Sequence, residues 1–169
     1  VTPVDDLTGA DDSYTVLEDG TLAANDADGT TTGGDPSDDG VGANDSTTSG
    51  GSLSFAVDSG PSSGSLSLNA NGTFTYSPDA DFNGTDTFTY TVTDAAASES
   101  STQTVDIIVT QDNDPGSFGG DLTPSTPEDT PLTGNVTFSD TADGFTPNFS
   151  VGAATNGTVF INPVSGEYT

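Results

Sequence analysis

The sequence of 169 residues contains no lysine, arginine, histidine, cysteine, methionine or tryptophan. Without imidazole, thiol or ammonium groups, most acid–base and nucleophilic catalysis is excluded. The Cys and His ligands of zinc, haem and iron–sulfur clusters are also missing. Because Lys and Arg hold phosphate groups, we expect no nucleic-acid partner. No apolar run approaches the roughly 18 residues of a membrane span, so we also expect no direct membrane insertion.

The functional groups that remain for chemistry or metal binding carry oxygen atoms. The chain carries 27 Asp and Glu residues and a formal net charge of −27. Carboxylate, amide and carbonyl oxygens are ligands for hard cations, above all Ca²⁺. Paired carboxylates also serve in glycoside hydrolysis. Nothing in the sequence places an acid near an apolar pocket, so we predict that the chain is not an enzyme.

Hydrophobic residues make up 30% of the chain, which together with the high net charge is typical of a disordered acidic segment. The arrangement of the apolar residues argues against disorder. Residues 87–93 alternate strictly between threonine and Phe88, Tyr90 or Val92, which is the period of a half-buried β-strand. Further strands are predicted at 52–57, 65–68, 72–76 and 105–109, and the turn pair Asn71–Gly72 opens the strand at 72–76.

No segment shows a helical apolar period, and Gly, Pro, Asn, Asp and Ser separate the predicted strands. Short alternating strands between turn signals favour an all-β fold of the β-sandwich type.

The chain also repeats itself. Residues 15–22 match residues 125–132 at a separation of 110, and residues 64–69 match residues 157–162 at a separation of 93. The first copy therefore contains an insertion of about 17 residues, which we expect to form an acidic surface loop. The near-duplicates 22–26 and 41–45 bracket it, which predicts an insertion near 27–45.

These matches predict three segments. Residues 1–6 are the end of a preceding repeat or a linker, 7–112 are the first repeat, and 113–169 are a second repeat that is truncated before its last strands. Two alternatives are open for the missing strands: a longer tandem array, or strands supplied by neighbouring molecules across exposed sheet edges.

The segments 11–22, 24–26 and 71–94 carry a family resemblance, with the stretch from Tyr76 to Asp94 its most specific part. They resemble the cadherin-like, immunoglobulin-like and VCBS-type tandem repeats of giant bacterial surface adhesins and extracellular filaments. The resemblance implies tandem β-sandwich modules in a secreted, cell-surface protein of adhesion or biofilm. It covers the first copy nearly whole and the second as far as its truncation.

Between the copies, Asp112–Asn113–Asp114 resembles the Asp-x-Asn-Asp linker of cadherins, in which calcium stiffens the joint between modules. Two carboxylates and an amide at this spacing offer hard oxygen ligands. Side ligands are expected from Glu18 and Asp19 at one module end and from Glu128 and Asp129 at the other. The alternative is a solvated acidic turn before Pro115.

Two other acidic segments are weaker candidates. The carboxylates of residues 79–86 precede the strongest strand, but turn formation and packing of Phe82 explain this segment better. Residues 25–29 lack the closing glutamate of an EF-hand loop.

The leading functional hypothesis is a non-enzymatic structural or adhesive protein, whose modules form an extracellular rod or filament with calcium at the joints. Its partners are then neighbouring repeats or identical subunits. One alternative is a subunit that polymerises by donor-strand exchange. Another is a module that binds a glycan, ice or another surface ligand, with residues 35–40 as its recognition loop.

Overall fold

The computed structural model describes residues 5–26, 39–140, 146–153 and 157–169. The chain divides into two compact units, Val1–Asp112 and Asn113–Thr169. The regular secondary structure in the described ranges consists of β-strands, with no helix. The predicted all-β fold class is therefore confirmed. Residues 1–4 and most of the predicted acidic insertion, residues 27–38, lie outside the described part. No helix in the described part is long and apolar enough to cross a lipid bilayer.

The strands of the first unit are short, with two exceptions in its second half. They are β1 (Leu7–Thr8), β2 (Asp12–Leu17), β3 (Leu22–Ala24), β4 (Ser46–Thr47), β5 (Leu53–Ser59), β6 (Gly64–Leu68), β7 (Phe74–Pro78), β8 (Gly84–Asp94) and β9 (Glu99–Thr110). Those expected from alternation all form, and β8 and β9 extend beyond their predicted ends.

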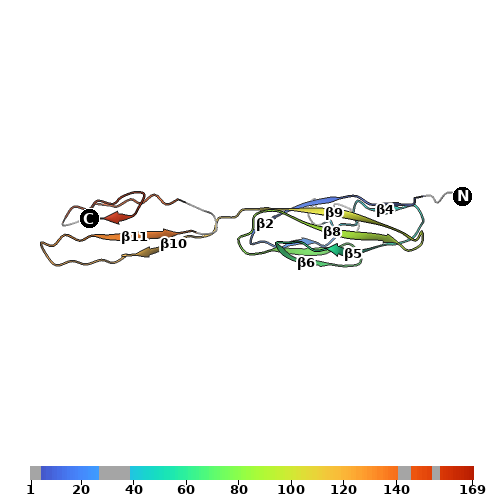
Figure 1. The fold of residues 1–169 in the computed structure, drawn as a ribbon, viewed down its shortest axis with the longest axis horizontal. Helices are drawn as coiled ribbons and strands as arrows, with labels where there is room; N and C mark the ends of the chain where they lie inside the picture. The colour runs from blue at the N-terminus through green and yellow to red at the C-terminus, as the bar shows by residue number, and fades with distance from the viewer. Residues whose placement is uncertain (1–4, 27–38, 141–145, 154–156) are drawn as a thin grey trace. The chain divides into compact units, whose positions relative to one another are not determined.

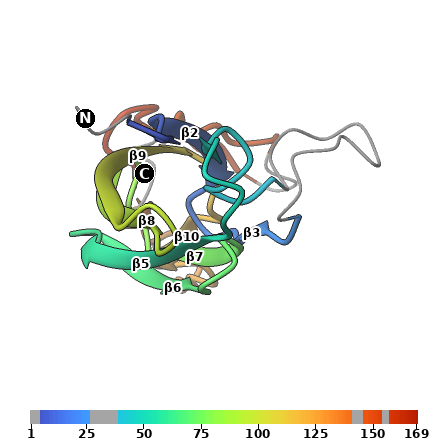
Figure 2. The ribbon, with the colours of Figure 1, turned by 90° about the vertical axis from the view of Figure 1, so that its right-hand side faces the viewer.

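Two sheets face each other in the first unit. One has the strand order β2-β9-β8-β5, and the other has the order β3-β7-β6. Figure 2 shows β3, β7 and β6 on one side of this unit and β2 and β9 on the other. Strands β2 and β9 run parallel, with Leu17 opposite Thr110, so that both strands end at the same edge. A small ribbon of β1 and β4 completes the unit.

The core of the first unit fills the space between its sheets. Inward-facing side chains of β8 and β9 form much of it: Phe88, Tyr90, Val92, Val105, Ile107 and Val109. They pack with Tyr14, Phe55, Phe74 and Tyr76 from the other strands. The ring of Phe74 makes edge contacts with Tyr14 and Phe88, at centroid distances of 4.9 and 5.7 Å. Burial of these aromatic rings is the main favourable term for this fold.

The turn at Asn71–Gly72 forms as predicted. Gly72 has a φ of 92°, a conformation that favours glycine. The Asn71 side chain accepts hydrogen bonds from both the amide and the hydroxyl of Thr73. The turn connects β6 to β7 and places Leu66 opposite Tyr76 in the antiparallel pair.

The second unit contains three strands in the order β10-β11-β12: β10 (Ser117–Gly120), β11 (Gly134–Ser139) and β12 (Glu167–Tyr168). Its pairing repeats part of that of the first unit, whereas the antiparallel pair of β10 with β11 has no equivalent in the β3-β7-β6 sheet. Gly134 lies opposite Tyr168, as Ala24 lies opposite Phe74. Ile161 bridges Tyr168, as Leu68 pairs with Phe74. Ala24 and Gly134 are 110 positions apart, and Leu68 and Ile161 are 93 positions apart, which are the separations found in the sequence. Strands β11 and β12 and the bridge at Ile161 therefore correspond to β3, β7 and β6.

The second unit has no counterpart of the core described above. Every buried hydrophobic residue in the described part of the chain belongs to the first unit. In the second unit, large apolar side chains remain exposed instead: Phe118, Leu122, Val151, Val159, Phe160 and Val164. Strands β8 and β9 supply six of the 14 buried hydrophobic residues of the first core, and no strand among the described residues of the second unit corresponds to them. Figure 1 shows β10 and β11 as a ribbon pair.

Candidate calcium-binding residues and buried carboxylates

Glu18 is the predicted ligand with the most specific surroundings. It follows β2 directly, and its amide donates to the carbonyl of Thr110 at 3.0 Å. Because β2 and β9 are parallel and end together, Glu18 meets the residues that follow β9. Its Oε1 accepts the amide of Asp112 at 2.9 Å, and its Oε2 accepts the Asn83 side-chain amide at 3.3 Å. The residue is only 2% exposed.

The other predicted ligands lie on the surface. Asp19 sits in the turn after β2, and Asp112 and Asn113 are exposed, with the Asn113 side chain donating to the carbonyl of Asp114 at 3.2 Å. Glu128 and Asp129 form an exposed turn of the second unit. The structure therefore brings Glu18 to the backbone of Asp112, whereas a joint that combines residues of both units stays a prediction.

The chemistry at Glu18 fits a hard cation in one respect. A buried carboxylate is costly unless it is paired with an opposite charge or well hydrogen-bonded. Glu18 has only neutral hydrogen-bond donors, and the chain contains no Lys, Arg or His to neutralise it. Within the described ranges, however, no group of three or more acidic residues is close enough to hold a metal by itself. Oxygens of Glu18 and Asp112 would be two of the ligands, and the remainder would have to come from backbone, amide or water oxygens.

The loop of residues 79–86 is structural. Phe82 packs against the core, and the carboxylate at the end of the loop, Asp86, is 2% exposed. Its five donors lie between 2.9 and 3.1 Å: the Ser62 amide and hydroxyl, the Ser63 amide, the Thr87 amide and the Tyr76 hydroxyl. Burial opposes ionisation of Asp86, but these hydrogen bonds hold its pKa below the usual value.

Asp94 is a second buried carboxylate, at the other end of β8. It accepts hydrogen bonds from the hydroxyls of Ser49 and Thr47 and from the amides of Ala96 and Ala97. The two hydroxyls contribute most, and together the four donors lower its pKa to about 2. Asp94 therefore fastens the segment after β4 and the β8–β9 turn to the sheet.

Two further carboxylates, those of Asp12 and Asp45, meet at the fully buried Tyr90. The Tyr90 hydroxyl lies 3.1 Å from Asp12 Oδ2 and 3.0 Å from Asp45 Oδ2. Burial is the main cause that raises the pKa of both carboxyls, that of Asp12 to about 7, and the charge of Asp45 raises the pKa of Asp12 further. Neither carboxylate was among the residues predicted from the sequence.

One sequence signal marks two of these buried acids. The alternation of β8 continues through Asp86, Phe88, Tyr90, Val92 and Asp94, all of which are buried. An acidic residue in phase with the apolar face therefore indicates a carboxylate inside the sandwich. No comparable signal marks Asp12 or Asp45, because their partner is a side chain about 80 and 45 residues away along the chain.

The sandwich topology and the sequence both correspond to a known family. The model of the bacterial cadherin-like domain matches residues 3–111. The chain belongs to the bacterial cadherin-like domain family. Members of this family are in general non-enzymatic extracellular modules of adhesive or structural proteins. The resemblance inferred from residues 11–94 is therefore confirmed.

One solved structure supports the fold. Drosophila N-cadherin EC1-4 is similar at a TM-score of 0.50 and 18% identity, over 94% of this chain and 38% of that one. An endo-fucoidan hydrolase of glycoside hydrolase family 107 matches with a TM-score of 0.37 and 20% identity, over 66% of this chain and 14% of that one. The chain thus spans well under half of either structure. No curated protein sequence matches it.

Proposed function

We propose that this chain is a non-enzymatic segment of a cell-surface rod or filament, in which cadherin-like modules follow one another and calcium stiffens the joints. The observation that carries the proposal is the buried carboxylate of Glu18 at the end of the first unit, hydrogen-bonded to the amide of Asp112. The family supports an adhesive or structural role, and its members generally bind Ca²⁺.

In this proposal the chain's own residues fix the positions of the oxygens. Pairing of Leu17 with Thr110 sets Glu18 beside the start of the linker. The hydrogen bond from Asn83 orients the second carboxylate oxygen. Oxygens of Glu18 and of Asp112 to Asp114 would hold a calcium ion, which would supply the positive charge that the sequence lacks. Glu128 and Asp129 are the predicted ligands of the second unit.

Calcium titration of the intact chain tests the proposal. Binding to the folded state alone stabilises it by about 2.7 kcal/mol when free calcium is at a hundredfold its Kd. We expect calcium to raise the Tm, excess chelator to reverse the rise, and the variant Glu18→Gln to lose most of it. The matched control is Glu99→Gln, which removes one carboxylate of the same unit that binds the Asp6 and Leu7 amides. Equal calcium responses in all three proteins would refute the proposal.

The second candidate is a subunit that accepts strands from another molecule. The exposed apolar side chains of the second unit favour it, because contiguous exposed apolar surface marks an interaction site. Appending a copy of residues 76–110 after Thr169 would supply counterparts of β8 and β9 within one chain. If strand exchange operates, concentration-dependent assembly of the natural chain should disappear in this fusion. A fusion whose copies of Phe88, Tyr90 and Val92 are serine should still assemble.

A further inference from the structure

The hydroxyl of Tyr90 is surrounded by oxygen atoms. Tyr90 is 0% exposed. Four acceptors lie within hydrogen-bonding distance of its hydroxyl: the carbonyls of Ala10 at 3.2 Å and Val41 at 3.1 Å, and the carboxylates of Asp12 and Asp45. They come from the start of β2 and from the segment before β4, which lie far apart in the sequence. All of them converge on one atom of β8.

The Tyr90 hydroxyl has fewer protons than the four acceptor oxygens around it require. A tyrosine hydroxyl donates one proton and can accept through its lone pairs. If both carboxyls are ionised, only one of the four oxygens can receive a hydrogen bond, and the other three face the hydroxyl oxygen without a proton between them. A proton on Asp12 or Asp45 turns that carboxyl into a donor to the Tyr90 oxygen. The Tyr90 hydroxyl can then accept a hydrogen bond from the protonated carboxyl and donate one to the ionised carboxylate.

The charges around the cluster favour that proton. The charge of Asp11 also acts on Asp12, and the charges of Asp12, Asp39 and Asp45 all act on the Tyr14 hydroxyl, which donates to the carbonyl of Asp39 at 3.0 Å. Burial has the largest effect on Asp12 and raises its pKa, whereas the hydrogen bonds from Tyr90 and Asn44 lower it. From β5 the ring of Phe55 packs on Tyr90, and from β9 the amide of Thr104 binds Asp11. None of these groups is positive, since the chain has no basic side chain.

We propose that Asp12 and Asp45 share one proton at the Tyr90 hydroxyl, and that this proton fastens the start of β2 and the segment 40–48 to the core as a pH-sensitive lock. Asp45 extends the lock, because its other oxygen accepts the amide of Ala10 at 2.8 Å. The β1–β4 ribbon adjoins both segments through the pairing of Thr8 with Ser46. Loss of the proton leaves two carboxylates on one hydroxyl and loosens this end of the first unit.

The direction of the pH dependence follows from linkage. The pKa of Asp12 is raised by burial to about 7, above the value of about 3.9 in an unfolded chain. The lock therefore contributes its full stability at pH values below the unfolded pKa, and loses it as the pH rises through about 7. Between pH 5 and pH 8 the equilibrium constant for unfolding should increase on the order of ten- to a hundredfold from this group.

Carbon-13 NMR of the Asp side-chain carboxyls in the intact chain, with chelator present, tests the lock directly. We expect one carboxyl of the pair to titrate with a midpoint near 7 and the amides of residues 40–48 to shift with the same midpoint. Midpoints below pH 5 for both Asp12 and Asp45 would overturn the proposal. So would a stabilisation of residues 40–48 that requires calcium at every pH.

Variants separate the lock from the general effect of negative charge. Asp12→Asn carries a permanent donor in place of the shared proton, so its stability should no longer fall between pH 5 and pH 8. Asp45→Asn should behave in the same way and serves as the second variant if the first does not fold. The matched control, Asp106→Asn, removes one exposed charge from β9 and should keep the natural pH dependence. A control that loses the pH dependence as completely as Asp12→Asn would contradict the lock.

Discussion

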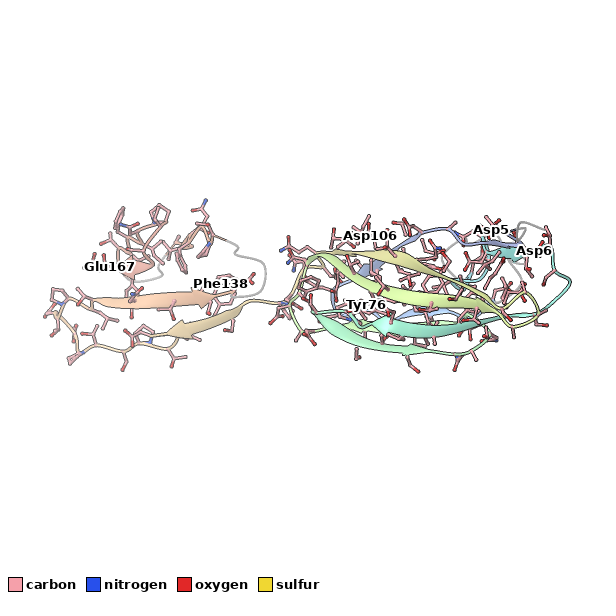
Figure 3. All side chains as sticks on the ribbon, turned by 45° about the vertical axis from the view of Figure 1, so that its right-hand side comes forward. Asp5, Asp6, Tyr76, Asp106, Phe138 and Glu167 are labelled. Atoms are coloured by element: carbon pink, nitrogen blue, oxygen red, sulfur yellow. The ribbon has the colours of Figure 1, made fainter. Side chains whose placement is uncertain are left out.

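At the scale of single residues, this chain shows how a protein without basic side chains buries carboxylates. Asp86 and Asp94 are each held by amides and hydroxyls rather than by a positive charge. Several neutral hydrogen bonds to one carboxylate can stabilise its ionised form. In Figure 3, Tyr76, one of the donors to Asp86, lies within the first unit, and Asp106 lies on its outer side. Buried acids are therefore structural elements of this sandwich.

Replacement of Asp86 should destabilise the first unit strongly. Asp86→Ala removes the acceptor of the Ser62, Ser63 and Tyr76 donors and leaves buried polar groups without partners. We expect a loss of about 3 kcal/mol in the free energy of unfolding, because each unsatisfied buried group costs about 1–3 kcal/mol. Urea unfolding measures this loss. Asp106→Ala, at an exposed position of β9, should change stability by less than about 0.5 kcal/mol. Similar losses in both variants would contradict the structural role of Asp86.

Asp94 should determine part of the acid sensitivity. Its pKa of about 2 lies below the unfolded value of about 3.9, so its contribution is present at neutral pH and is lost as the pH falls from about 4 through 2. In Asp94→Asn this acid-dependent loss should be absent, although the variant is less stable at pH 7. Circular dichroism during acid titration tests this, with the exposed Asp58→Asn as the control. If Asp94→Asn loses stability at acid pH as the natural chain does, other carboxylates cause that loss.

Residue patterns predicted much of the fold and less of the site. The alternation of residues 87–93 specified β8 and its buried face, because a period of two fixes which side chains face the core. Asp86 and Asp94 continue that alternation and could have been identified from it. The cluster of Asp12 and Asp45 at Tyr90 could not, since it depends on the parallel pairing of β2 with β9 and on a loop whose path the sequence does not encode locally. The linker ligands remain predictions.

At the scale of elements, the two units share part of one sheet and differ in the rest. The register of β11 with β12 reproduces that of β3 with β7. The long strands β8 and β9 are paired over eleven residues, from Gly84–Val109 to Asp94–Glu99, and they have no counterparts among the described strands of the second unit. Because those strands provide six of the fully or almost fully buried side chains of the first core, the two units should differ sharply in local stability.

Hydrogen exchange measures that difference. The amides of β8 and β9 that pair within the four-stranded sheet should exchange slowest, at rates limited by global unfolding of the first unit. The amides of β10, β11 and β12 should exchange through local opening, orders of magnitude faster, because no closed core covers them. Mass spectrometry of peptic fragments resolves the two units. Comparable protection in β11 and β8 would mean that the second unit is covered in solution, and the strand-exchange fusion would then identify the covering strands.

At the scale of the whole molecule, charge is the dominant property. Twenty-seven carboxylates without one basic side chain repel one another at neutral pH, and this favours solubility and separation of the units. Salt screens such repulsion at any cation composition, with a Debye length of about 8 Å at physiological ionic strength. A calcium ion held as proposed would act differently, because it would bind specific oxygens rather than screen charge in general. The two effects can therefore be separated at constant ionic strength.

Measuring the mobility of the two units relative to each other distinguishes salt screening from calcium binding. Nitrogen-15 relaxation gives a rotational correlation time for each unit, from amides of β8 and β9 in the first and of β11 in the second. We expect different correlation times in chelator, since the units then tumble partly independently, and converging times on addition of calcium. Sodium chloride at matched ionic strength should leave them different, and Glu18→Gln should weaken the response to calcium. Converging times in sodium chloride alone would mean that screening, rather than a bound ion, governs the joint.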